Sequence, residues 1–533
     1  MKKTATLLAV LTATHIFPLA LQAQTPADEA PADDTAPIKA PAKEGATNRQ
    51  AIQAYNAGVA AINKNDLLEA ARQFEKAVTL SPTDAGAQMF LGYVRLRQDK
   101  YPEALTSLEA AKKLGSLDAK LQPVLYNNLG IAYANSDRAD DALEAYEQAI
   151  KLSKQEYTDA RFNLAFALLA QKKTKDAVPH LLKLRGQRPT DKSFQASIYD
   201  GLAEAYEAEE DWAKALGAYN EVIKYNPNDP TARFNFALSL SKAGRVNDAI
   251  VQAKEVLKLR ANHEPSLLLL GDLYSRQTKW KEAKGFLTRY VKAKPSEFSA
   301  WFSLAVAHDY LSEFDPALTA YAKAEAITPD DPSVKNNIGR IHFKRKKYPN
   351  AITKLREALE LDKDFEDARI NLALVFAAQE KWEDANQEWN TYLDGIRARL
   401  QTAGVSAEEK TSLKARALSA RGALAENYLK SAKYPNAANE YRAILVETPK
   451  NLDAMSNLGL ALYHIKNYEE ATKIYRDVIR LDPKNAIAQN NLGVVLEARG
   501  LREEAVAAYQ QAIKLKPGYE EAIKNRDRLT RAT

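Results

Sequence analysis

The strongest constraint on the fold is an internal repeat. Shifting the sequence against itself by 34 residues aligns five consecutive units most clearly, between residues 196 and 365. The same frame extends in both directions and gives thirteen units, which start at residues 51, 85, 123, 158, 196, 230, 264, 298, 332, 366, 418, 452 and 486. A repeat of this length is one supersecondary unit that buries its apolar face only against its neighbours. We therefore expect stacked units rather than several ordinary domains.

Within the units, the positions of small and large residues repeat. Position 8 is always Gly or Ala, and position 20 is Ala in all thirteen units. Small residues there allow two antiparallel helices to approach closely. Position 24 is large and apolar in all units but the sixth, and its aromatic residues include Tyr146, Tyr219, Tyr321, Trp389, Tyr441, Tyr475 and Tyr509. We interpret this aromatic series as core packing. Position 32 is Pro in eight units, which ends the second helix of each.

These positions resemble the tetratricopeptide-repeat family, in which a large residue, Leu, Gly or Ala, then Ala, an aromatic residue, Ala and Pro recur in this order. The match covers roughly nine tenths of the mature chain, meaning the residues that follow the signal peptide predicted below. The resemblance implies an all-α fold, a right-handed α-solenoid superhelix of antiparallel helix hairpins. The composition fits, because only 20 of 533 residues are Gly and 27% are charged, which suits exposed helix faces. The chain looks like an exported bacterial member of this family.

The N-terminus predicts export. Lys2 and Lys3 precede an apolar stretch between Ala5 and Leu21, and Ala23 supplies the small residue at a cleavage site. This pattern predicts a signal peptide over residues 1–23, cleaved after about Ala23, and a periplasmic or secreted product. A membrane anchor is the alternative, but the short, broken apolar run makes it the poorer fit. No later segment is apolar for long enough to span a bilayer.

The remaining segments divide the chain further. Residues 24–50 are rich in Pro, Ala and acidic residues, and they predict a disordered spacer. Repeats 1–10 occupy 51–399 and repeats 11–13 occupy 418–519, with 400–417 outside the period. There, Ser406 and Glu409 predict a capping box that opens an overlong helix running into the eleventh unit. This segment could be a hinge or an elongated hairpin. Residues 520–533, with Ile523 and Leu529, predict a final capping helix.

The sequence offers no catalytic or metal site. Cysteine is absent, and the histidines are scattered singly, without metal-ligand spacing. His308 and His342 both stand at position 11, where we expect partly buried packing residues. No phosphate loop or nucleophile elbow occurs, and too little chain remains outside the repeats to fold an active site. We expect no enzyme, no cofactor and no metal. The net charge is +6, or +4 without Lys2 and Lys3, and acidic and basic residues alternate along the helices. This nearly balanced charge argues against a nucleic-acid partner.

One polar series suggests a binding surface. Position 6 is Asn in eight units: Asn56, Asn128, Asn163, Asn235, Asn337, Asn371, Asn457 and Asn491. On an α-helix, position 6 lies roughly opposite the core positions 4, 7, 8 and 11. The resemblance implies that the first helices line a concave surface, so these amides would form a ladder able to hold an extended peptide backbone. Position 9 varies between Glu204, Asp272 and Arg340, which indicates no simple anion clamp.

The sequence therefore predicts a non-catalytic scaffold that binds a protein or an extended peptide along this surface. The alternative is a structural subunit or adaptor of an envelope export, polysaccharide-secretion or assembly complex. An enzyme that carries the repeats as an accessory would need a further domain. The identity of the partner is not encoded in any motif.

Overall fold

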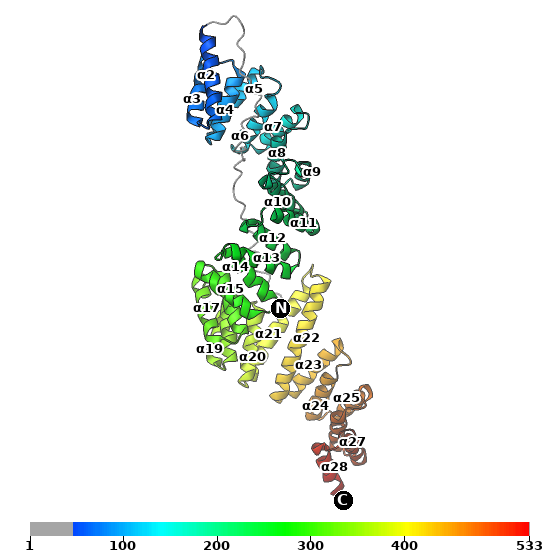
Figure 1. Ribbon diagram of the computed structural model, residues 1–533. Helices are drawn as coiled ribbons and strands as arrows, with labels where there is room; N and C mark the ends of the chain where they lie inside the picture. Colours follow the sequence, from blue (N-terminus) through cyan, green and yellow to red (C-terminus); the bar gives the residue numbers. More distant parts are fainter. Residues whose placement is uncertain (1–45, 532–533) are drawn as a thin grey trace. The chain divides into compact units, whose positions relative to one another are not determined.

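The structure, a computed structural model, describes residues 46–531, so the predicted signal peptide and nearly all of the predicted spacer lie outside the described residues. Every regular element in this range is a helix (Figure 1). The prediction of an all-α solenoid is confirmed. The described residues form two compact units, 46–294 and 295–531. No helix between residues 46 and 531 combines the length and the apolar character needed to cross a bilayer.

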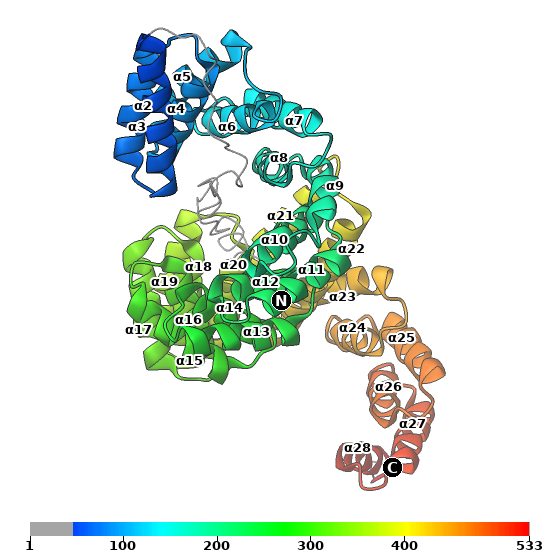
Figure 2. The same cartoon turned by 45° about the horizontal axis from the view of Figure 1, so that its top comes forward.

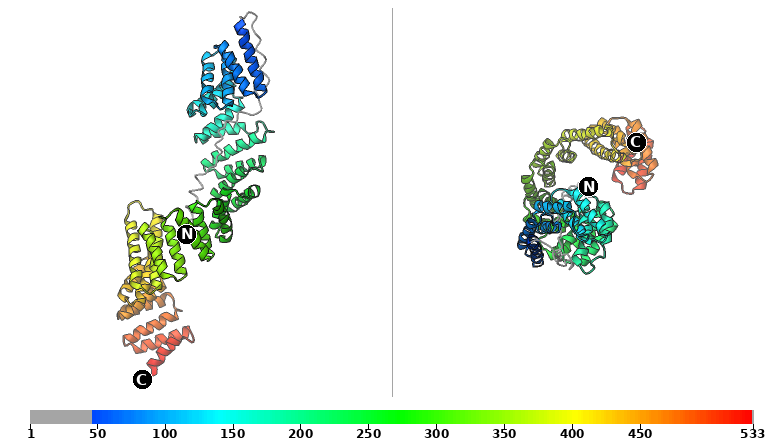
Figure 3. Two further views of the ribbon diagram at one scale, coloured as in Figure 1. Left: turned by 90° about the vertical axis from the view of Figure 1, so that its left-hand side faces the viewer. Right: turned by 90° about the horizontal axis from the view of Figure 1, so that it is seen from above.

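The first unit consists of seven antiparallel hairpins, drawn in blue to green in Figure 3. Its helices are α2 (Ala46–Asn63), α3 (Leu67–Leu80), α4 (Ala85–Arg97), α5 (Tyr101–Leu114), α6 (Gln122–Ala134), α7 (Ala139–Leu152), α8 (Thr158–Ala170), α9 (Thr174–Leu184), α10 (Lys192–Ala208), α11 (Trp212–Tyr225), α12 (Pro230–Lys242), α13 (Val246–Leu259), α14 (Glu264–Arg276) and α15 (Trp280–Ala293). Each hairpin packs against the next one along the chain.

The second unit consists of six hairpins and a final helix, and Figure 2 shows its last helices in orange to red. Its helices are α16 (Phe298–Tyr310), α17 (Phe314–Ile327), α18 (Pro332–Lys344), α19 (Tyr348–Leu361), α20 (Glu366–Ala378), α21 (Trp382–Gln401), α22 (Ala407–Lys430), α23 (Tyr434–Glu447), α24 (Leu452–His464), α25 (Tyr468–Leu481), α26 (Ala486–Ala498), α27 (Arg502–Leu515) and α28 (Glu520–Arg531). The same hairpin packing recurs in this unit.

The two small-residue positions set the distance between the helices of a hairpin. The Ala at position 20 is at most 1% exposed in every hairpin. Where position 8 is Gly, it faces the side chain at position 24 of its own hairpin. A Cβ on Gly459 would lie 2.7 Å from Tyr475, and one on Gly271 would lie 2.6 Å from Leu287. The large residue at position 24 therefore fills the space that the small residue leaves open.

The turn inside each hairpin has one conformation that the repeat pattern does not reveal. Position 15 adopts positive φ in all thirteen hairpins, but it is Gly only at Gly244 and Gly500. The other eleven turns place residues such as Thr278 (φ 58°) and Ala432 (φ 57°) in the left-handed region. A Cβ disfavours this region, so these turns are held by the helices on either side.

Two long helices of successive hairpins, α21 of 20 residues and α22 of 24 residues, pack against each other in the second unit. The Ser406 hydroxyl accepts a hydrogen bond from the Glu409 N–H at 3.1 Å, so α22 begins with half of a capping box. The Glu409 carboxylate instead accepts from Arg399 at 2.5 Å. Buried residues such as Ile396 and Leu413 form a core cluster between these two helices.

Candidate peptide-binding surface

The position-6 asparagines form part of a hydrogen-bonded ladder between repeats. Asn163 Nδ2 donates to Asn127 Oδ1 at 2.9 Å, and Asn371 Nδ2 donates to Asn336 Oδ1 at 2.8 Å. In both pairs the acceptor stands at position 5 of the preceding repeat. The last helix continues the pattern, because Asn525 of α28 donates to Asn490 Oδ1 at 3.2 Å. Part of the carboxamide series therefore joins neighbouring repeats.

Other members of the series lie near core tyrosines. Burial raises the pKa of Tyr441 and Tyr475, the aromatic residues at position 24 of the preceding repeat, and the amides of Asn457 and Asn491 oppose the rise. The Tyr475 hydroxyl itself donates to the Ser456 carbonyl at 3.1 Å. Asn337 Oδ1 accepts from the neighbouring Asn336 Nδ2 at 3.4 Å. These amides are half-buried rather than free on an open face.

Three members remain. Asn56 is exposed near the start of the described chain, and Asn128 is 4% exposed with Nδ2 unpartnered among the described residues. Asn235 is half-buried and lines a cavity. Ligand contact by the series stays a prediction, and Asn235 is the member that the structure places in a cavity.

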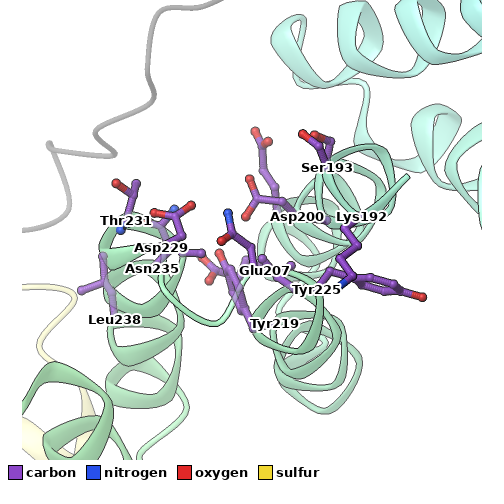
Figure 4. Close-up of a pocket in the computed structure, with 16 residues that line it drawn as sticks. Lys192, Ser193, Asp200, Glu207, Tyr219, Tyr225, Asp229, Thr231, Asn235 and Leu238 are labelled. Carbon is purple, nitrogen blue, oxygen red and sulfur yellow. Dashed lines mark hydrogen bonds between the residues drawn. The ribbon is translucent and has the colours of Figure 1, made fainter. Parts of the chain in front are cut away.

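That cavity, which we call the α10–α12 pocket, has a volume of about 640 Å³ and is lined by residues from Lys192 to Leu238. In Figure 4, Asp200 and Glu207 extend from α10, Tyr219 from α11 and Asn235 from α12. The cavity is in the usual size range for ligand pockets, about 300–1,000 Å³. It can accept a side chain together with part of the attached backbone.

The α10–α12 pocket is strongly acidic. Asp200, Glu204 and Glu207 follow each other on one face of α10, and Asp229 contributes a fourth carboxylate from the start of α12. Glu207 accepts from Lys242 Nζ at 3.3 Å, and Asp229 Oδ1 accepts from the Thr231 N–H at 2.8 Å. Within residues 46–531, neither Asp200 nor Glu204 has a hydrogen-bond donor or a cation as partner.

The unpartnered carboxylates hold their protons more tightly than usual. Burial, with the charges of Asp229 and Glu207, raises the pKa of Asp200 from 3.8 to about 6. Burial, with the charges of Asp200 and Glu207, raises the pKa of Glu204 from 4.5 to about 7. A cation placed between the two carboxylates would relieve both effects. Perturbed groups of this kind mark candidate binding sites.

The sequence contains a signal for this pocket that the repeat pattern conceals. Position 9 of this repeat is acidic, at Glu204. The signal for the pocket is that Glu204 shares one helix face with two further acidic residues, Asp200 and Glu207. Like charges four residues apart destabilise a helix, so such a pattern on a half-buried face indicates a function for the charges. The structure adds Asp229, which caps the N-terminus of α12 by accepting from the Thr231 N–H.

The second unit contains a contrasting site around Asp309. This carboxylate is 2% exposed and accepts from Arg340 Nη2 at 2.6 Å and from Lys344 Nζ at 2.8 Å. Two cations thus meet one buried anion. His308 and His342 are half-buried in the same helices, as packing residues would be. No group of three or more His, Asp or Glu side chains between residues 46 and 531 has the geometry of a metal site.

The repeats match known family models over most of the described chain. A tetratricopeptide-repeat model matches residues 127–192, 201–262, 268–332, 423–485 and 467–520, which is more than half of the sequence. Related models for the same repeat match 54–84, 83–155 and 339–380. The chain belongs to the tetratricopeptide-repeat family. Proteins of this family generally mediate protein–protein interactions.

Three curated relatives each match part of this chain. Tetratricopeptide repeat protein 21A of Homo sapiens is 24% identical over 42% of this chain and 18% of its own length. Protein O-mannosyl-transferase TMTC3 of Homo sapiens is 26% identical over 60% of this chain and 36% of its own length. The peroxisomal targeting signal receptor of Candida albicans is 34% identical over 20% of this chain and 18% of its own length. The chain thus spans about a third or less of these relatives.

Two solved structures align with this chain at low identity. A tetratricopeptide-repeat protein described as having an unusual peptide-binding site, YrrB, aligns with a TM-score of 0.32 and 19% identity over 39% of this chain and 98% of its own. The Naa15/Naa10 complex bound to HypK aligns with a TM-score of 0.34 and 13% identity over 90% of this chain and 96% of the matched one.

Proposed function

We propose that this tetratricopeptide-repeat protein is a non-catalytic interaction scaffold, and that its α10–α12 pocket binds a basic side chain of an extended partner segment. The observation that carries this proposal is the pair Asp200 and Glu204, two half-buried carboxylates without a cationic partner among the described residues. A Lys or Arg side chain would supply the missing charge, and Arg could bond both carboxylates at once. Asn235, on the opposite wall of the pocket, would bond the backbone of the same segment.

The relatives are compatible with this function without defining it. Peroxisomal targeting signal receptors of two yeasts are named as receptors, and the matches to them cover 22% and 20% of this chain. The match to the mannosyl-transferase TMTC3 covers 36% of that protein. Neither recognition of a targeting signal nor transferase activity is part of the proposed function.

A positional-scanning library of fluorescent peptides on the purified mature chain tests the proposal. The expected result is selection of Lys or Arg at one position, lost in the double variant Asp200→Asn/Glu204→Gln. A matched control, Glu144→Gln/Glu147→Gln, removes the same charge from exposed sites on α7. Selection that is independent of basic residues, or that the α7 variant weakens equally, would refute the pocket as the binding site.

Export of the chain is also a proposal. It is supported by three features of the N-terminus: Lys2 and Lys3, the apolar stretch that follows them, and Ala23 at the predicted cleavage site. An adaptor in an envelope export, polysaccharide-secretion or assembly complex would be one form of an exported scaffold. N-terminal sequencing of the protein purified from its native host is the test. A mature N-terminus near Gln24 is expected, and an intact Met1 in the mature protein would contradict export by cleavage.

A further inference from the structure

The α10–α12 pocket has a counterpart in the second unit, the site around Asp309. The repeats that start at 196 and 230 form the pocket, and those that start at 298 and 332 form the Asp309 site. In both, a Lys at position 13 of the second repeat donates to an acidic residue at position 12 of the first. Lys242 Nζ donates to Glu207 at 3.3 Å, and Lys344 Nζ donates to Asp309 at 2.8 Å. The two sites are therefore versions of one ion pair between successive repeats.

Two further positions are the same in both sites. Position 24 of the first repeat is a buried tyrosine, Tyr219 in the pocket and Tyr321 in the Asp309 site. Position 6 of the second repeat is an asparagine, Asn235 in the pocket and Asn337 in the Asp309 site. Because this framework is shared, the residues that differ decide what each site can hold.

The main difference lies at position 9 of the second repeat. In the Asp309 site this residue is Arg340, whose Nη2 donates to Asp309 at 2.6 Å. Burial raises the pKa of the Tyr321 phenol, and Arg340 opposes the rise, because its guanidinium lies close to that phenol. In the pocket, position 9 is Leu238, an uncharged residue of the lining that is labelled in Figure 4. The pocket therefore has no equivalent of the arginine that its counterpart contains.

The pocket also has more negative charge than its counterpart. Asp200 and Glu204 occupy positions 5 and 9 of its first repeat, where the Asp309 site has Phe302 and Val306. Together with Glu207, three carboxylates of the pocket share one ammonium group, that of Lys242. In the Asp309 site, two cations share one carboxylate. The missing guanidinium thus coincides with a surplus of carboxylates.

The shared framework favours arginine over lysine as the ligand of the pocket. The lysine of the framework is already present as Lys242, and only the arginine is missing. Asp200 and Glu204 are four residues apart, or about 6 Å along the axis of α10. A planar guanidinium with five N–H donors can bond two separate carboxylates, whereas an ammonium group acts as a point charge.

From this comparison we propose that the α10–α12 pocket selects arginine, and that the partner's guanidinium takes the place that Arg340 takes in the second unit. This inference rests on the proposed function and narrows it, because that function is satisfied by either Lys or Arg.

The first test compares three capped pentapeptides, Ala-Ala-X-Ala-Ala, on the full mature chain at pH 8. X is arginine, lysine or the neutral citrulline, and saturation-transfer NMR titration gives each Kd. We expect the arginine peptide to bind at least tenfold more tightly than the lysine peptide, and the citrulline peptide to show no binding. Equal or tighter binding of the lysine peptide would overturn the selection of arginine and leave the proposed function intact. If neither basic peptide binds, both proposals are wrong.

The second test supplies the arginine from the chain itself. Leu238→Arg places a guanidinium at the repeat position of Arg340, so it should fill the pocket and weaken binding of the arginine peptide at least tenfold. Its thermal midpoint at pH 8 should be unchanged or raised, because the new cation pairs with the surplus carboxylates. The control is Leu374→Arg, which adds the same charge at position 9 of another repeat, where the side chain is 40% exposed. This variant should bind as wild type does.

Undiminished binding of the arginine peptide by a folded Leu238→Arg chain would contradict the proposal. If Leu238→Arg does not fold, the three peptides on the wild-type chain still decide between arginine and lysine.

Discussion

Asn371 Nδ2 donates a hydrogen bond to Asn336 Oδ1 at 2.8 Å, and this contact joins two successive repeats of the second unit. The residues lie one repeat plus one position apart in the sequence. The carboxamide at position 6 thus has a structural partner before any ligand arrives. A series that looks like a free binding ladder in the sequence is, in part, a connection between repeats.

The first prediction concerns this connection. Asn371→Ala should lower the free energy of unfolding by about 1 kcal/mol, because it removes a half-buried hydrogen bond. A double-mutant cycle with Asn336→Ala isolates the pair, and a coupling energy of about 0.5–1.5 kcal/mol is expected from urea denaturation. Strictly additive effects would show that the two amides do not interact in solution.

The second prediction concerns the close approach of paired helices. Gly459→Ala should destabilise the protein by about 1–3 kcal/mol, because its Cβ would meet the Tyr475 ring at 2.7 Å. Gly422→Ala is the control, since a Cβ there meets nothing within 4 Å and Ala is the better helix former. It should stabilise the chain by about 0.5–1 kcal/mol. Equal effects of the two substitutions in thermal denaturation would contradict this packing.

The third prediction concerns the hairpin turns. Thr278→Gly should stabilise the protein, by about 1 kcal/mol, because a β-branched residue at φ 58° is strained and Gly is not. Thr319 is an exposed helical residue, and Thr319→Gly should destabilise by a few tenths of a kcal/mol. The measurement is the urea midpoint of each variant. A loss of stability in Thr278→Gly would mean that the turn is not left-handed.

The fourth prediction concerns pH. The pKa values of Asp200 and Glu204 are raised to about 6 and about 7, so the folded state binds more protons than the unfolded state between about pH 4 and 7. Stability is therefore highest below this window and falls as pH rises through the folded-state pKa values. The loss between pH 5 and pH 8 should be on the order of 2 kcal/mol.

Asp200→Asn/Glu204→Gln should remove that part of the pH dependence and make the free protein more stable than wild type at pH 8. Comparing urea denaturation of both proteins across the pH range isolates the two groups from all other titrations. Parallel stability curves for the two proteins would show that these carboxyls titrate normally. The predicted gain in stability accompanies a predicted loss of binding, as expected for charges retained for a ligand.

The period alone predicted the repeats, because positions 8, 20 and 24 face one another across each hairpin and tolerate few residue types. The partners of Asn163 and Asn371 were not predictable, because they depend on how neighbouring repeats are rotated and not on the spacing within one repeat. The left-handed position 15 was also hidden, since most turns place ordinary residues such as Lys346 there. The α10–α12 pocket was not predictable either, because its acidic residues have the sequence pattern of a solvated helix face and the sequence does not show that they are half-buried.

The most direct test of the proposed function is calorimetric titration with a basic peptide selected from the library. We expect the affinity to rise from pH 5.5 to pH 8, as Asp200 and Glu204 ionise. We also expect it to fall more than tenfold when the selected Lys or Arg is replaced by acetyl-lysine or citrulline. If the wild-type chain binds the peptide with an affinity that depends on neither pH nor the basic charge, the proposed function is wrong.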